Sequence, residues 1–195
     1  MKLIALEWMS LDGVTQSPSY PDEDASDGFR HGGWHRRFFE EISMNWVLEG
    51  VAGADAYLLG RGTYDNFARH WPNAGPDEQM FAGPLNSRPK YVASSRPLDL
   101  QWHNSHRLDA DLGPAVSRIK SAGSGTLALV GSPKLAQSLF ALGLIDELRV
   151  MIDPLIVGSG KRLFGSSVEP LHFDLQSCRP VATGAMLATY TRAAA

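Results

Sequence analysis

Short apolar runs alternate with segments of helical periodicity up to residue 142. Apolar runs typical of buried strands occupy residues 2–9, 54–59, 90–94 and 126–130. Apolar residues recur at helical spacing over residues 35–50, 63–71, 112–122 and 133–142. Strands that alternate with helices in this way predict an α/β fold with a largely parallel sheet.

The pattern changes after Gly143. Residues rich in β-branched or alternating apolar side chains occupy 145–152, 154–157, 171–177 and 186–191. Strands without intervening helices indicate antiparallel additions at one end of the sheet. We therefore expect a three-layer α/β/α domain with a central mixed, mostly parallel sheet and antiparallel C-terminal strands. The chain has no low-complexity linker and no internal repeat, so residues 1–195 are interpreted as a single domain.

Residues 14–33 fit neither periodicity. This polar stretch contains Pro and Gly and follows the first predicted strand. A loop of this length inside a compact domain is usually functional. We expect it to act as a loop or lid beside a binding site.

Composition and charge exclude several classes of protein. The 195 residues are 44% hydrophobic and 20% charged, which is close to the globular average. The net charge is −3, and Lys and Arg are scattered, so the basic stripe of a nucleic-acid-binding protein is missing. Cys178 is the only cysteine, so no intrachain disulfide can form. Glu7 and Asp12 interrupt the apolar N-terminus, and no run is long enough to span a bilayer. A cytoplasmic protein is expected.

Three segments place small or hydroxyl-bearing residues where a buried strand ends and a helix or turn begins. They are Leu58-Leu59-Gly60-Arg61-Gly62-Thr63, Val92-Ala93-Ser94-Ser95-Arg96 and Leu129-Val130-Gly131-Ser132-Pro133. In an open α/β sheet the carboxyl ends of the strands form the ligand crevice, and helix N-termini there bind phosphate. Each segment alone is also compatible with an ordinary turn. Because Arg61 and Arg96 add two positive groups, the set favours NADPH over NADH.

The order and spacing of these segments resemble the dihydrofolate reductase superfamily, and within it the branch related to the reductase domain of riboflavin biosynthesis (RibD C-terminal domain). Further shared marks are Ser10-Leu11-Asp12-Gly13, Leu59-Gly60-Arg61-Gly62-Thr63-Tyr64, Trp71-Pro72, Leu144-Ile145-Asp146-Glu147-Leu148, Asp153-Pro154-Leu155-Ile156-Val157-Gly158-Ser159-Gly160 and Leu163-Phe164. Matches run from about residue 3 to residue 190. The resemblance implies an NADPH-dependent reductase that acts on a small, planar heterocycle, pteridine- or pyrimidine-like, and that forms a homodimer.

The resemblance also implies a role for each matching residue. Phosphate would be held by Gly60, Arg61 and Thr63. The adenosine end would be held by Ser94, Ser95 and Arg96. The pyrophosphate and the nicotinamide side would be held by Gly131, Ser132 and Leu135. Two positions depart from the family, because Ser132 replaces the second Gly of a Gly-Gly pair and Val130 replaces an acidic residue that grips the substrate. The second departure argues against the riboflavin-pathway substrate.

The acceptor side is predicted less directly. Hydride transfer needs an acceptor stacked on the nicotinamide and a proton source nearby. Asp12 follows the first strand and is our candidate for orienting substrate or water, although its place in an Asp-Gly turn also explains it. Glu40 and Glu41 are placed on the first helix, where dihydrofolate reductases carry their pterin-binding carboxylate, or they are solvated charges.

Tryptophan side chains are the other candidates for the acceptor pocket. Trp8, Trp34 and Trp71 either wall a pocket for a flat aromatic substrate or pack in the core. A protein that binds NADPH or a small molecule on the same fold without turnover is the alternative function.

Other motifs are weaker. Gly158-Ser159-Gly160-Lys161 resembles a phosphate-binding Walker loop, but Arg162 occupies the position that needs Ser or Thr, so a turn is expected. His31 and His35 have the spacing of metal ligands on a helix, but no third ligand is evident and no metal is expected. A Rossmann dehydrogenase is disfavoured because no Gly-x-Gly-x-x-Gly follows the first strand.

Overall fold

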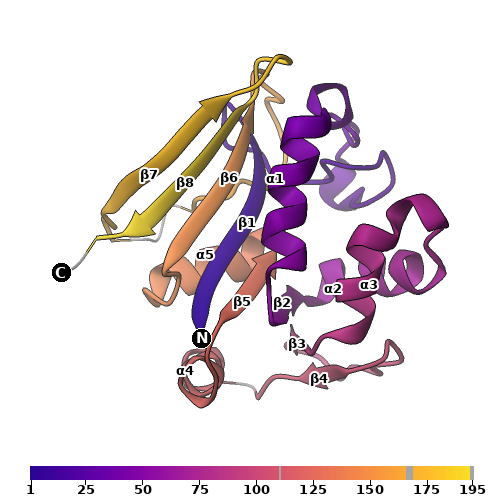
Figure 1. Cartoon of the computed structure of the whole chain (residues 1–195), viewed down its shortest axis with the longest axis vertical. Coiled ribbons are helices and arrows are strands. Elements are labelled where there is room, and N and C mark those ends of the chain that lie inside the picture. The colour runs from indigo at the N-terminus through magenta and orange to yellow at the C-terminus, as the bar shows by residue number, and fades with distance from the viewer. Residues whose placement is uncertain (110, 166–168, 194–195) are drawn as a thin grey trace.

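One eight-stranded sheet forms the centre of the protein, in the order β4-β3-β2-β5-β1-β6-β8-β7 (Figure 1). The computed structural model describes residues 1–109, 111–165 and 169–193. The strands are β1 (Lys2–Ser10), β2 (Ala56–Gly60), β3 (Lys90–Ala93), β4 (Ser105–Arg107), β5 (Thr126–Val130), β6 (Glu147–Asp153), β7 (Phe173–Pro180) and β8 (Met186–Arg192). Pairing is parallel from β4 through to β6 and antiparallel at β6–β8 and β8–β7. The predicted mixed, mostly parallel α/β fold with antiparallel C-terminal strands is confirmed.

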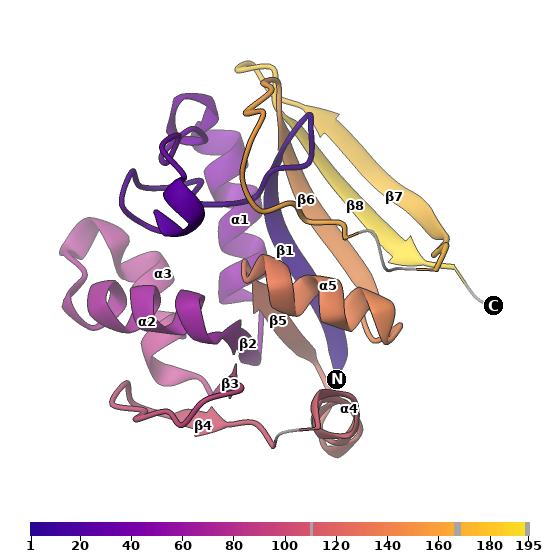
Figure 2. The same cartoon turned by 180° about the vertical axis from the view of Figure 1, so that it is seen from behind.

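Helices cover both faces of this sheet. One face carries α1 (Glu41–Ala52), α2 (Arg61–His70) and α3 (Gln79–Ser87), and the other carries α4 (Leu112–Ala122) and α5 (Pro133–Ala141). Figure 1 shows α1 in front of β1, and Figure 2 shows α5 on the opposite side. Short 3-10 turns occupy Ser26–Gly28, Arg36–Phe38, Trp71–Asn73 and Pro76–Glu78.

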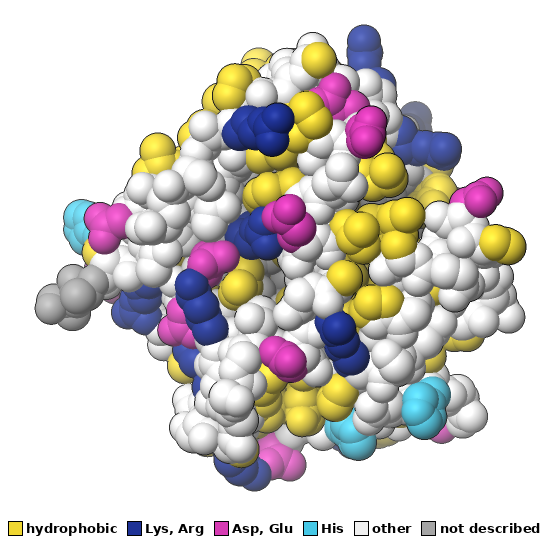
Figure 3. Space-filling model, in the orientation of Figure 1, with side chains coloured by type: hydrophobic (Ala, Val, Ile, Leu, Met, Phe, Trp, Pro, Cys, Tyr) yellow, Lys and Arg dark blue, Asp and Glu magenta, His cyan; other side chains and the backbone are white. Residues whose placement is uncertain are grey.

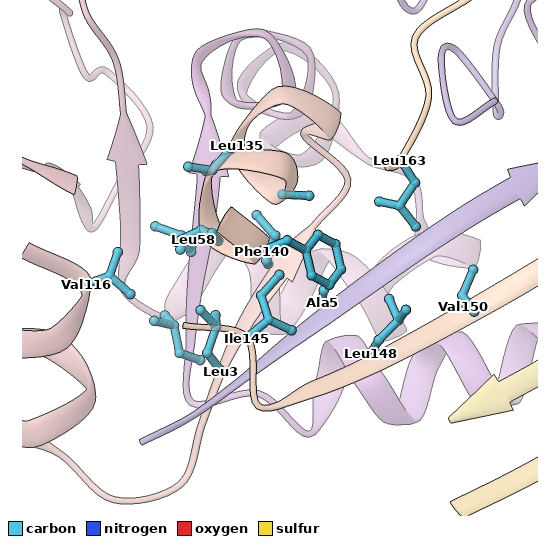
Figure 4. Packing of buried hydrophobic residues seen from close by; sticks show 14 of the residues in the cluster. Leu3, Ala5, Leu58, Val116, Leu135, Phe140, Ile145, Leu148, Val150 and Leu163 are labelled. Atoms are coloured by element: carbon cyan, nitrogen blue, oxygen red, sulfur yellow. The ribbon is translucent and has the colours of Figure 1, made fainter. Parts of the chain in front are cut away.

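Two apolar layers fix the helices to the sheet. On the α4 and α5 side, Leu3 and Ala5 of β1 pack with Leu58, Ile145 and Phe140 (Figure 4). On the other side, a second cluster joins β1, β2, β3 and β5 to the first three helices through residues that include Leu6, Val47, Leu59, Tyr64, Leu85 and Val130. Alternate residues of β1 therefore contact opposite helix layers, as the two-residue repeat of a strand requires.

Several predicted boundaries were wrong. The helix predicted for residues 35–50 begins at Glu41, because residues 36–38 form a 3-10 turn and the Glu40 backbone is extended. Residues 154–157 are not a strand, since the chain turns after β6 and the Leu155 N–H donates to the Asp153 carbonyl. Helix α3, which contains Pro84, and the three-residue strand β4 were not predicted.

Charged side chains are scattered on the face of the molecule shown in Figure 3, as the sequence predicts. Lys, Arg, Asp and Glu side chains are interspersed there rather than gathered by sign (Figure 3). Among the helices of the described ranges, none is both long and apolar enough to cross a membrane.

Candidate functional site

The topology places a crevice at the carboxyl end of β5. The helix that follows β5, α5, packs on one face, whereas the helices that follow its neighbours β1 and β2 pack on the other. Ligands bind where such connections diverge. Strand β5 ends at Val130, but β1 runs on to Ser10, so β1 extends past its neighbour at this point. The Gly131 N–H donates to the Leu6 carbonyl at 3.2 Å and so fixes the turn after β5 to β1.

Two of the predicted phosphate segments meet at this crevice. The Ser132 hydroxyl contacts both Thr63 and Gly60, donating to Thr63 Oγ1 at 2.7 Å and accepting from the Gly60 N–H at 2.8 Å. A Cβ on Gly60 would lie 3.1 Å from the Ser132 side chain, so a larger residue here would force Ser132 to shift by a few tenths of an ångström. Gly131 and Ser132 have φ of 59° and 67°, and a left-handed backbone at a non-glycine residue is strained. Together with the start of α5, they form a concave backbone suited to an anion.

The third predicted segment, residues 92–96, lies at the carboxyl end of β3, the strand next to β2. Gly60 is in register with Ala93, which places Ser94, Ser95 and Arg96 beyond β2. The Ser94 hydroxyl donates to the Arg96 carbonyl and accepts from the Arg96 N–H, which forms a turn. The side chain of Arg61 donates to the Pro97 carbonyl at 3.3 Å. Arg61 is about half exposed and pairs with Asp65 at 2.7 Å.

Leu135, the remaining residue of the predicted cofactor set, is buried beneath Gly60. The predicted cofactor residues therefore lie along one sheet edge, from β3 through β2 to β5. Their contact with a cofactor stays a prediction.

The Asp12 side chain is hydrogen-bonded mainly to backbone N–H groups. Its carboxylate accepts hydrogen bonds from the Ser10 hydroxyl (2.6 Å) and from the Val157 and Gly158 N–H groups (3.0 and 2.9 Å). Desolvation alone would raise its pKa, but these hydrogen bonds outweigh it and lower the pKa to about 2. Asp12 is therefore ionised at neutral pH and cannot donate a proton. The geometry favours its turn role, in which it ties the segment after β6 to the end of β1.

Trp8 and Trp34 meet around His35 on the α1 side of the sheet. Their ring centroids lie 6.0 and 6.3 Å from that of His35. His35 Nδ1 is 2.8 Å from Asp153 Oδ2, and both side chains are buried. Burial raises the pKa of Asp153, and the hydrogen bond with His35 opposes that rise. Among the described residues, His35 Nε2, Asp153 Oδ1 and Trp8 Nε1 have no hydrogen-bond partner.

The other acceptor candidates lie outside this cluster. Trp71 packs against His70 and Phe67, so the structure does not bring it to Trp8 and Trp34. Glu40 precedes α1 rather than lying within it, which corrects the predicted helix register, and its N–H donates to Ser43 Oγ at 2.9 Å. Glu41 is exposed on the first turn.

Sequence reasoning missed the most unusual carboxyl group, that of Glu7 on β1. The side chain is fully buried, and desolvation raises its pKa to about 8, opposed only by a hydrogen bond from Thr15 Oγ1 at 3.3 Å. Its Oε1 has no partner within the described ranges. The available signal was an acidic residue inside an otherwise apolar strand.

A cavity of about 430 Å³ lies between the loop of residues 14–33 and the Gly158–Lys161 turn. It is lined by Gln16, Asp27, Gly28, Phe29, Ser159, Gly160 and Lys161. Lys161 pairs with Asp24 at 2.5 Å, and the described residues that follow it, 162–165, are not helical, so the turn expected in place of a Walker loop is confirmed.

Comparison with known proteins gives concordant results. A family model described as the RibD C-terminal domain matches residues 1–187. The uncharacterized protein YyaP of Bacillus subtilis (strain 168) is 26% identical over 138 residues, which cover 70% of this chain and 73% of that protein.

Solved structures share the fold. A putative riboflavin biosynthesis protein from Shewanella sp. PV-4 has a TM-score of 0.70 at 19% identity, with both chains fully covered. A pyrimidine reductase-like protein from Corynebacterium diphtheriae has a TM-score of 0.65 at 13% identity, covering 100% of this chain and 92% of that one. RibD of Acinetobacter baumannii gives 0.64 at 14% identity, and the match covers 99% of this chain but 58% of that longer one.

Proposed function

The chain belongs to the RibD C-terminal domain family, and on this premise we propose that it is a reductase that transfers a hydride from NADPH to a small planar heterocycle. The observation that carries the proposal is the contact of Ser132 with Gly60 and Thr63 at the carboxyl end of β5. One solved relative is described as pyrimidine reductase-like and another as a riboflavin biosynthesis protein, which supports a pyrimidine- or pteridine-like acceptor.

The residues of the crevice fit a phosphorylated dinucleotide. The first main-chain N–H groups of α5 have no partner within the helix and would bind a diphosphate. The left-handed backbone at Gly131 and Ser132 leads into this helix, and Gly60 lies against the Ser132 side chain. Arg61, on the β3 side of this cradle, would hold the additional phosphate that distinguishes NADPH from NADH. When bound, the nicotinamide supplies the hydride.

The α1 side of the crevice supplies the surroundings of the acceptor. Trp8 and Trp34 offer aromatic surface, and the loop of residues 14–33 would exclude water from it. Because Asp12 is ionised, it can orient water but cannot itself protonate the product. Water oriented by Asp12 would supply the proton that the reduced acceptor needs at the heteroatom next to the carbon that receives the hydride.

A titration tests the proposal. The purified protein is titrated with NADPH and, separately, with NADH while quenching of its tryptophan fluorescence is followed. Preferential micromolar binding of NADPH supports the cofactor assignment, and pteridines, pyrimidines and quinones are then screened for NADPH oxidation. Absence of binding by both nucleotides would refute the reductase proposal. Tight NADPH binding without oxidation across the panel would favour the binding-protein alternative.

Replacement of Arg61 by Ala is expected to weaken NADPH more than NADH. Loss of a charge-assisted phosphate contact costs roughly 1.5 to 3 kcal/mol, or about a 10- to 100-fold rise in the NADPH Kd. The same titration measures the effect. Arg69→Ala is the matched control, since Arg69 lies on the last turn of the same helix. Equal weakening of both nucleotides by Arg61→Ala would show that this residue does not contact the distinguishing phosphate.

A further inference from the structure

Glu7 lies beside the crevice, one residue past the carbonyl that receives the Gly131 N–H. Its side chain is on the face of β1 that carries Leu3 and Ala5, the face covered by α5. It is 0% exposed, and its position in β1 lies just beyond the last residue of β1 that pairs with β5. A buried carboxyl group, with one oxygen that has no hydrogen-bond partner among the described residues, therefore lies one residue past the point where β5 ends.

The order of the strands indicates which end of a dinucleotide reaches Glu7. The segment assigned to the adenosine end, residues 94–96, follows β3, and the phosphate cradle lies between β2 and β5. Strand β1 is on the opposite side of that cradle from β3. A dinucleotide that binds in this direction extends its nicotinamide toward β1.

A protonated carboxyl group matches the chemistry of that end. The nicotinamide ring carries a carboxamide, and a neutral carboxylic acid can donate to an amide carbonyl and accept from an amide N–H. Burial keeps Glu7 neutral over most of the physiological range, as its pKa of about 8 indicates. Oxidation places a positive charge on the ring, and a cation within about 4 to 6 Å lowers the pKa of a carboxyl group by about 1 to 3 units.

We propose that Glu7 is a positioning residue for the nicotinamide end of the cofactor, which pairs with the carboxamide as a neutral acid and ionises when the ring is oxidised. Ionisation breaks the carboxyl O–H bond, leaves the electron pair on oxygen and passes the proton to water. This inference rests on the proposed function. Binding of the oxidised nucleotide is then coupled to the release of a proton. Binding of the reduced nucleotide releases no proton.

Other charged groups on the neighbouring elements are engaged elsewhere. After β6, Lys161 pairs with Asp24 and Arg162 lies 3.4 Å from Asp12. Lys134 is exposed on α5, and the His35–Asp153 pair belongs to the cluster on the α1 side. Within the described part of the chain, Thr15 is the one side chain hydrogen-bonded to Glu7. Glu7 is therefore the group expected to set the coupling.

The experiment measures the Kd of NADPH and of NADP⁺ between pH 6 and 9 by tryptophan quenching. Calorimetry in two buffers of different ionisation enthalpy counts the protons released. For the wild type, the affinity for NADP⁺ relative to NADPH should rise by about 10- to 100-fold from pH 6 to pH 8, with release of up to about one proton per NADP⁺. In Glu7→Gln this ratio should be independent of pH and no proton should be released. Asp174→Asn, at an exposed position on the edge strand β7, should behave as the wild type.

The outcomes separate this inference from the proposed function. If neither nucleotide binds the wild type, both fail. If both bind, and Glu7→Gln keeps the pH dependence and proton release of the wild type, the positioning role alone is overturned. Thr15→Val provides a second test in case Glu7→Gln does not fold. Because it removes the hydrogen bond that lowers the Glu7 pKa, it should move the rise in NADP⁺ affinity to higher pH, and an unchanged midpoint would contradict the proposal.

Discussion

Replacement of Asp153 by Ala should lower the free energy of unfolding by about 2 to 3 kcal/mol, because it leaves the buried imidazole of His35 without its hydrogen-bond partner. The carboxylate lies at the end of β6, 2.8 Å from His35 Nδ1. Without it, both imidazole nitrogens would lack a partner within a cage formed by the rings of Trp8, Trp34 and Phe39. Urea unfolding followed by tryptophan fluorescence measures the loss.

The protein contains its own control for this experiment. His70 and Glu78 form a pair of nearly the same length, 2.9 Å, but their side chains are 40% and 38% exposed. Glu78→Ala should therefore cost less than about 1 kcal/mol. Asp153→Asn keeps an oxygen that can accept from Nδ1–H and should recover part of the loss. Equal effects of Asp153→Ala and Glu78→Ala would show that burial does not strengthen the pair.

The alternation of apolar runs and helical periodicity was sufficient to predict the class of fold. Helix α4 and strand β5 begin and end where predicted, because each is bounded by Gly or polar residues and its apolar face is regular. The errors fall where local pattern and tertiary packing disagree. Residues 154–157 are apolar, yet Leu155 and Val157 pack beside the aromatic cluster as an irregular segment. Helix α3 was missed because Gly83 and Pro84 interrupt its sequence.

The candidate site could be predicted only in part, for a related reason. Strand-end Gly and Ser residues have a local signature, and the structure brings Gly60, Thr63 and Ser132 together. The residues that contact His35 and Glu7 have no such local signature in the sequence. His35 and Asp153 are 118 residues apart in sequence, and the spacing of His35 suggests only His31 as a partner. In the sequence, Glu7 is only a charge in an apolar segment, because its burial depends on α5 and on Thr15.

Burial of Glu7 also predicts how stability depends on pH. Its pKa is about 8 in the folded protein and 4.5 in the unfolded chain. Between these values the folded state holds one proton more than the unfolded state, so the free energy of unfolding falls as pH rises, by up to about 1.4 kcal/mol per unit. The stability that the neutral acid contributes is complete below about pH 4.5 and is lost by about pH 8. From pH 5 to pH 7 this one group should cost about 2 to 3 kcal/mol.

Glu7→Gln should abolish this contribution, because the amide has nearly the same shape and does not titrate. Urea unfolding of both proteins at pH 5, 6 and 7 measures it as a difference, from which the titration of all other groups cancels. Relative to the wild type, the variant should become more stable by about 2 to 3 kcal/mol over this range. Asp174→Asn, at an exposed position on β7, should run parallel to the wild type. If the curve of Glu7→Gln is also parallel, Glu7 is ionised in the folded protein. The stability of β1 then depends on a buried charge that has no cationic partner among the described residues.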